Sequence, residues 1–198
     1  MIADEFILLA QPWWVNLLVL IPVLSYPVFR KSGIRIAWSQ LILVGIFALA
    51  FGFVEAAVVI YIRASIGLLP GFQGTLTDVR QLSTGIYRQP FMVIQIPPAL
   101  TSIEVMREAA TIVMLSAVAL LAGKTRIERW AVFLWCFALW DSMYYAGLWI
   151  TVRWPYSLLV SDVLFLIPVP WVSQVWFPLL VSASAIVAVA SANAQSRT

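Results

Sequence analysis

The sequence contains no histidine and only one cysteine among its 198 residues. Without histidine, the chain cannot form a Ser-His catalytic pair, an HExxH zinc site or a His-ligated haem site. Lys31 and Lys124 are the only lysines, and both lie outside the long apolar runs, so no lysine is placed to hold retinal as a Schiff base. Cys136 has no second cysteine to pair with and is predicted to be a small buried side chain. Because no phosphate-binding glycine loop is present and no nucleophile can be named, the sequence favours a protein that is not an enzyme.

Charged residues are also scarce: they make up 11% of the chain, against about 25% in a typical soluble domain. Hydrophobic residues make up 63%, the mean hydropathy is +0.96, and the apolar runs are long and continuous. This composition excludes a soluble globule, a disordered chain and a barrel of alternating strands, and it predicts an all-α, polytopic transmembrane helical bundle. The net charge of +3 comes from Lys and Arg residues scattered at the ends of the runs, so membrane topology explains it better than nucleic-acid binding.

The apolar runs divide the chain into spans, because a helix needs about 20 apolar residues to cross the bilayer. The predicted spans are residues 13–29, 36–62, 103–122, 130–152 and 172–192. Residues 157–170 form a further apolar segment that is too short to cross and ends in prolines, so we interpret it as a tilted broken helix or a re-entrant segment. The sequence therefore predicts about six helical segments, with five spans as the alternative, in a single integral-membrane domain over residues 1–198.

Basic residues indicate the orientation, since short cytoplasmic loops are enriched in Lys and Arg. They cluster after the first span and between the third and fourth spans, at Arg30, Lys31, Arg35, Lys124, Arg126 and Arg129. These two loops are therefore predicted to be cytoplasmic. The N-terminus and the long loop over residues 64–102 are then predicted to lie outside.

Charged residues within or beside the spans are the candidate functional residues, because a charge at mid-span costs at least about 2.5–3.5 kcal/mol. Glu55, for example, lies eight positions before Arg63 and so roughly 12 Å below the end of its helix at 1.5 Å per residue. All the candidates fall in the middle or outer half of the bilayer in the predicted orientation. We therefore expect a polar cluster formed by Glu55, Arg63, Glu104, Arg107, Glu108, Asp141, Tyr144, Tyr145, Arg153 and Asp162.

Such a cluster could form internal pairs, relay protons or bind a hard cation through oxygen. If a metal binds, its ligands are predicted to be Glu55, Glu108 and Asp141. Tyr144 and Tyr145 follow Asp141 by three and four positions, so their hydroxyls are expected to reach its carboxylate.

Three of these acids also have a purely structural interpretation. Thr101 and Glu104 match a capping box, which would make Glu104 a helix cap. Glu108 would then lie in the first turns, where a negative charge suits the helix dipole. Asp162 could likewise cap a half-helix.

Four segments of the sequence resemble an uncharacterised family of small bacterial membrane proteins. They cover residues 53–59, 107–111, 154–158 and 162–171, including the run Asp162 to Trp171. The resemblance implies a location in the bacterial inner membrane and no established activity.

Two functions remain open. The first is a non-catalytic accessory subunit of a larger membrane complex, with lipids and other membrane subunits as partners and bound lipid or pigment as a possible cofactor. The alternative is a cation- or proton-coupled transporter, or a membrane enzyme, that uses the carboxylate, arginine and tyrosine cluster. The absence of a catalytic constellation favours the first, and the cost of intramembrane charge favours the second.

Overall fold

A computed structural model describes residues 9–63 and 98–196 of the chain. Its elements are a 3-10 helix η1 (Trp13–Val19) that continues into α1 (Leu20–Ser32), then α2 (Trp38–Arg63), α4 (Pro98–Ala122), α5 (Arg126–Val152), β1 (Ser161–Phe165), β2 (Trp171–Gln174) and α6 (Trp176–Gln195). In these residues, five helical segments are long and apolar enough to cross a membrane. The predicted transmembrane helical bundle is therefore confirmed, in its five-span form.

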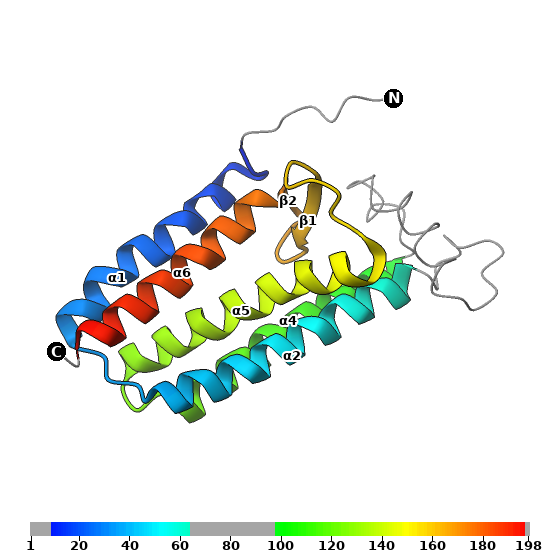
Figure 1. Cartoon of the computed structure of the whole chain (residues 1–198). Helices are drawn as coiled ribbons and strands as arrows, with labels where there is room; N and C mark the ends of the chain where they lie inside the picture. Colours follow the sequence, from blue (N-terminus) through cyan, green and yellow to red (C-terminus); the bar gives the residue numbers. More distant parts are fainter. Residues whose placement is uncertain (1–8, 64–97, 197–198) are drawn as a thin grey trace.

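Helix α5 is the centre of the bundle. It packs against α2, α4 and α6, while α1 packs mainly against α6. In Figure 1, α1 and α6 form one pair, and α5 runs between this pair and the helices α2 and α4. Side chains from three helices can therefore converge on one face of α5.

Small residues let α2 approach α5 closely. A Cβ atom built on Gly52 would lie only 2.3 Å from the carbonyl oxygen of Trp140. One turn further, a Cβ atom on Gly147 would lie 3.0 Å from the Cβ atom of Ala56. Contacts between small residues are a common way for membrane helices to pack, because lipid provides no hydrophobic drive for association.

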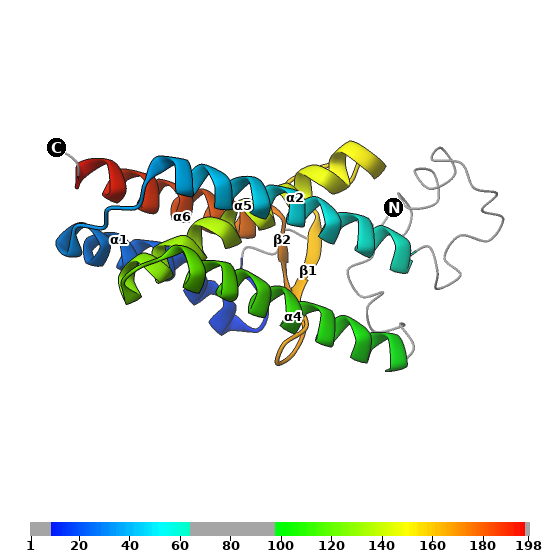
Figure 2. The same ribbon diagram turned by 90° about the horizontal axis from the view of Figure 1, so that it is seen from below.

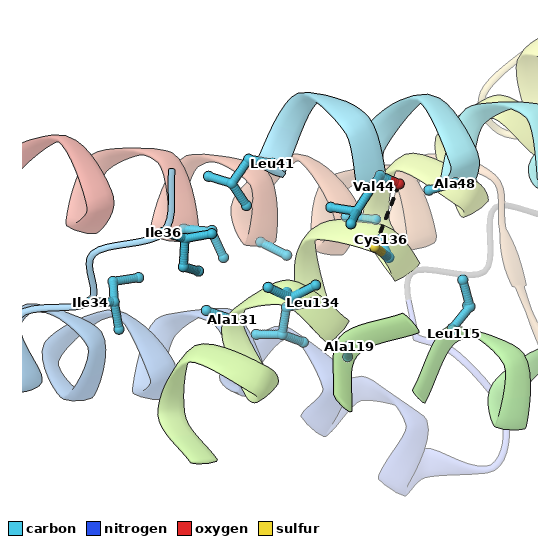
Figure 3. Close-up of a cluster of buried hydrophobic side chains, with 14 of the residues drawn as sticks. Ile34, Ile36, Leu41, Val44, Ala48, Leu115, Ala119, Ala131, Leu134 and Cys136 are labelled. Carbon is cyan, nitrogen blue, oxygen red and sulfur yellow. Dashed lines mark hydrogen bonds between the residues drawn. The ribbon is translucent and has the colours of Figure 1, made fainter. Parts of the chain in front are cut away.

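The main apolar core lies between α2, α5, α4 and the end of α6 (Figure 3). Cys136 is fully buried there, and its thiol donates a hydrogen bond to the carbonyl oxygen of Val44 at 3.7 Å. The expectation that Cys136 is a buried side chain is confirmed. The same core includes Leu41, whose carbonyl accepts a hydrogen bond from the indole of Trp135 at 2.9 Å.

One end of the bundle collects the two basic connections and the end of α6, and we call it the basic end. The guanidinium of Arg35 donates to the carbonyl of Ser196, and the Asn193 side chain hydrogen-bonds both backbone groups of Ile36. Glu128 forms a capping box with Thr125 at the start of α5. Glu128 therefore caps a helix, a role that its position in a basic loop did not suggest. The positive-inside rule predicts that this end is cytoplasmic.

The opposite end carries an antiparallel hairpin of β1 and β2. The broken helix predicted over residues 157–170 is thus wrong, and the described residues contain five apolar helical segments in place of six. The alternative of a re-entrant segment stays a prediction. Pro168 and Pro170 cannot donate backbone hydrogen bonds, and the run between Asp162 and Ile167 is rich in side chains that favour strands. Backbone hydrogen bonds between Gln11 and Val172 cover the outer edge of β2. The paired strands satisfy their polar backbone, as a low-dielectric surrounding requires.

The start of α4 also differs from the prediction. The helix begins at Pro98, a residue type that favours the first helical position, so Thr101 and Glu104 lie inside the helix and do not cap it. Asp162 lies in β1, so its predicted role as a helix cap is wrong as well. Of the long loop predicted over residues 64–102, residues 98–102 are helical and the remainder lies outside the described residues.

Candidate functional site

A cavity of about 80 Å³ lies between α2, α4, α5 and the hairpin, and we call it the polar cavity. Four of the predicted acids and one arginine line it, together with both tyrosines: Glu55, Glu104, Arg107, Glu108, Asp141, Tyr144 and Tyr145. Backbone and side chains of residues 163–166 close it at the hairpin. Figure 2 shows how the hairpin crosses the bundle beside α4 and α2. The structure therefore brings together seven of the ten candidate residues from three helices.

Arg107 is the central cation of the polar cavity. Its guanidinium forms an ion pair with Glu55 of α2 and a bidentate pair with Glu104, one turn earlier on α4, at 2.8 and 3.2 Å. Glu55 also accepts a hydrogen bond from the hydroxyl of Thr111 at 3.4 Å. Both carboxylates are more than nine-tenths buried. This network ties α2 to α4, two helices that share few backbone contacts.

Glu108 forms a hydrogen bond with the backbone at the end of the hairpin strand β1. Its carboxylate accepts the backbone N–H of Leu166 at 2.8 Å, just beyond the end of β1. Leu166 follows the last residue of β1, so its N–H lies outside the strand pairing. A buried backbone donor without a partner costs roughly 1–3 kcal/mol, so Glu108 stabilises the position of the hairpin over the cavity.

Asp141 is held by α6. Its carboxylate accepts a hydrogen bond from the Ser182 hydroxyl at 2.8 Å. For Tyr145, the expected contact with Asp141 is not the one that forms: its hydroxyl donates to Asp162 of β1 at 3.1 Å. A helix contact between Asp141 and Tyr145 is geometrically possible at this spacing, but the hairpin offers Tyr145 a buried acceptor across the bundle. Asp162 therefore belongs to the polar cluster through its contact with Tyr145, although it does not line the cavity.

Arg153 stands apart from this arrangement. Arg153 is exposed, ends α5 in a left-handed conformation with φ of 57°, and stacks its guanidinium 4.6 Å from the ring centre of Trp149. It is not among the residues that line the polar cavity. The side chain of Arg63 lies outside the described residues.

The carboxylates of the cavity do not converge as a metal site does. Across residues 9–63 and 98–196, no three acidic or cysteine side chains are grouped closely enough to hold a metal ion. The oxygens of Glu55, Glu108 and Asp141 instead face three different partners: a guanidinium, a backbone N–H and a hydroxyl. The geometry gives the predicted cation trio no support.

Three polar residues in or beside the cavity were not among the sequence candidates: Thr111 and Trp140 line it, and Ser182 contacts Asp141. Thr111 lies on the same face of α4 as Arg107 and Glu108, so helical spacing alone could have indicated it. Ser182 lies in an apolar helix and carries no such signal. Trp140 lines the cavity, and its buried indole N–H has no hydrogen-bond partner among the described residues.

Among the described residues, the formal charges of the polar cavity are unbalanced. Four carboxylates and one guanidinium line it, and Asp162 adds a further carboxylate through Tyr145. Since Arg107 is already paired twice, no described cation of the lining is left for Asp141 or Glu108. The cavity can therefore receive positive charge, either as protons or as a small cation.

Comparison of the chain with protein-family models, with curated proteins and with solved structures finds no match. The five apolar helices define a multi-pass integral membrane protein that contacts lipid. Which member of that broad class it is must be argued from the polar cavity.

Proposed function

We propose that this membrane protein is a cation- or proton-coupled transporter whose polar cavity binds a small organic cation. The observation that carries the proposal is the excess of carboxylate over guanidinium within the cavity. A charge within a bilayer is expensive, and residues that bear this cost commonly belong to ion or substrate pathways. The volume of about 80 Å³ suits a cation of a few heavy atoms, since pockets for drug-sized ligands reach about 300–1,000 Å³.

Two other functions fit the five apolar helices as well. A non-catalytic accessory subunit would need lipid-facing and partner-facing surface. The structural contacts of Glu55 and Glu108 are compatible with it, but it does not require more carboxylates than guanidinium groups in one cavity. A membrane enzyme would need an activated nucleophile or a bound cofactor next to these groups. The lining offers neither a cysteine nor a lysine, and the hydroxyl of Thr111 is bonded to Glu55, whose charge Arg107 already neutralises. The carboxylate excess therefore favours transport over both.

The same proposal places the protein in a bacterial inner membrane, with the hairpin end outside. The cluster of Arg and Lys residues at the basic end supports this orientation. The resemblance of residues 154–171 to small bacterial membrane proteins supports the location.

Binding of ethanolamine tests the proposal directly. The full-length protein in phosphatidylcholine nanodiscs is titrated calorimetrically, and uptake of radiolabelled ethanolamine into proteoliposomes is compared with protein-free vesicles. We expect saturable binding that Asp141→Asn weakens at least about tenfold, which is about 1.4 kcal/mol. Asparagine retains an oxygen that can accept the Ser182 hydroxyl, so the variant removes charge with little change in shape.

Glu128→Gln is the matched control, because Glu128 is an acid at the opposite end of α5 and glutamine also completes a capping box. We expect it to bind ethanolamine like the wild type. Equal binding by wild type and Asp141→Asn, or no saturable binding and no uptake, would contradict the proposal.

A further inference from the structure

An apolar groove of about 440 Å³ runs along the bundle between α1 and α4, with α5 and α6 beneath it. Its floor carries an aromatic row on one face of α5, formed by Trp130, Phe133 and Phe137, whose adjacent ring centres lie 5.5 and 6.0 Å apart. Phe165 and Trp171 of the hairpin line its far end. The groove therefore leads from near the basic end of α5 to the hairpin.

A small space of about 50 Å³ lies between the apolar groove and the polar cavity, and we call it the junction. This space shares Phe137 and Trp171 with the groove, and it shares Trp140 and Asp141 with the polar cavity. The aromatic row continues across the junction, since the rings of Phe137 and Trp140 have centres 5.4 Å apart. Along one face of α5, the lining thus changes from purely apolar to acidic within about one helical turn.

Trp140 gives independent evidence that the junction takes a ligand. It is only 6% exposed, and its indole N–H lacks a hydrogen-bond partner among the described residues. The N–H of Trp171, on the other side of the junction, is also buried and unpartnered within the same residues. Buried donors without acceptors are rare in proteins, so a molecule that places an oxygen here would satisfy them.

We propose that the apolar groove, the junction and the polar cavity form one site for an amphiphile with a single hydrocarbon chain and a cationic amino-alcohol head. The chain lies over the aromatic row, the hydroxyl accepts from the indole donors at the junction, and the ammonium group lies among the carboxylates near Asp141. This inference rests on the proposed cation-binding function and names its substrate class.

The head group determines the selectivity of this site. A hydrocarbon chain that leaves the bilayer for the groove exchanges one apolar surrounding for another, so it gains little hydrophobic free energy. Any single-chain lipid could therefore enter the groove, but only a cationic head complements the acidic cavity. A phosphate or carboxylate head would meet carboxylates without a free guanidinium, because Arg107 is paired with Glu55 and Glu104.

Competition binding in phosphatidylcholine nanodiscs tests the inference with three compounds. The full-length protein is photolabelled with 1-aminododecan-2-ol, called aminododecanol below, that carries a diazirine at the end of its chain. Unlabelled aminododecanol, dodecanol and ethanolamine compete with this label. We expect labels on the groove faces of α4 and α5. We also expect aminododecanol to compete at a mole fraction at least about tenfold below that of dodecanol, which corresponds to about 1.4 kcal/mol.

A pair of variants on α4 separates the chain from the head. Ala109 is exposed and lines the groove, so Ala109→Phe is expected to fill it and to abolish labelling. Ala110 is exposed but does not line the groove, and Ala110→Phe is expected to label normally. Calorimetric binding of ethanolamine is expected to stay unchanged in both variants, since neither residue lines the polar cavity.

The outcomes distinguish the two proposals. If dodecanol competes as well as aminododecanol, or if Ala109→Phe labels like the wild type, the single-site inference is wrong even when ethanolamine binds. If ethanolamine also fails to bind, the cation-binding function falls with it. If Ala109→Phe and Asp141→Asn each abolish labelling by aminododecanol, both proposals are supported.

Discussion

Gly52→Ala should separate α2 from α5 and so loosen the framework of the polar cavity. The new methyl group would lie 2.3 Å from the carbonyl oxygen of Trp140 and 3.0 Å from the Cβ atom of Met143. A carbon atom normally stays about 3.3–3.6 Å from a carbonyl oxygen even in a weak C–H···O contact. The two backbones must therefore move apart by about 1 Å, because a carbonyl in the middle of a helix cannot rotate away.

The magnitude follows from two opposing effects. Overpacking in a close-packed interior typically costs about 1–3 kcal/mol. Alanine in a helix gains up to about 1 kcal/mol over glycine. We expect a net loss of about 1–2 kcal/mol in the free energy of unfolding, together with weaker ethanolamine binding, because Glu55 lies one turn from Gly52 on the same helix.

Gly45→Ala is the control, two turns away on α2. Its added methyl group would meet the Cδ1 atom of Leu139 at 3.0 Å and the indole nitrogen of Trp135 at 3.2 Å. These are side-chain atoms that can shift, so the gain in helix propensity should offset the contact and leave stability within about 0.5 kcal/mol of wild type. Reversible unfolding by dodecyl sulfate in mixed micelles, followed by tryptophan fluorescence, measures both variants. If Gly52→Ala proves as stable as Gly45→Ala, the close approach of α2 and α5 is wrong.

Three further predictions concern other parts of the described chain. Arg107→Met should destabilise the fold by about 3–5 kcal/mol in the same unfolding assay, because it leaves two buried carboxylates without their cation. Arg153→Met should cost no more than about 1 kcal/mol, because it removes only an exposed stacking contact with Trp149. Equal effects of the two substitutions would contradict the Arg107 network. Thr125→Ala should cost about 1 kcal/mol through loss of the hydrogen bond from the Glu128 N–H, with no change in ethanolamine binding. Cys136 should react with a maleimide only after unfolding, so rapid labelling of the native protein in nanodiscs would show that its burial is wrong.

The spans could be predicted from the sequence because each apolar run is long, although prolines interrupt the first and the last. The run around residues 38–61, for instance, admits no other structure in a bilayer. The hairpin could not be predicted in the same way. A short apolar run such as the one between Asp162 and Ile167 is consistent with either a buried strand or a helical segment, and the pairing with Trp171–Gln174 that decides between them is a tertiary contact.

The candidate site could likewise be predicted only in part from the sequence. Helix topology sufficed to place Glu55, Glu108 and Asp141 at one level, because rise per residue and alternation of spans determine depth. The partner of each acid depends on the rotation of each helix and on the hairpin, neither of which a single sequence encodes in a local pattern. The sequence therefore could not predict that Asp141 bonds to Ser182 or that Tyr145 bonds to Asp162.

The hairpin also explains why this bundle has a polar cavity and an apolar groove at all. A sixth helix between α1 and α4 would cover the aromatic row of α5 and fill the groove with its own side chains. The chain instead folds residues 161–174 across one end, where the strand pairing, the Gln11 contact and Glu108 satisfy the backbone. No described residue then covers the space along α5, while its inner end is closed by the hairpin and lies next to the acids of the polar cavity. Replacing Glu108 by glutamine should preserve this arrangement, since the amide oxygen can still accept the Leu166 N–H. Glu108→Leu should lose it, and the expected result is a free energy of unfolding lower by about 1–3 kcal/mol in the leucine variant alone.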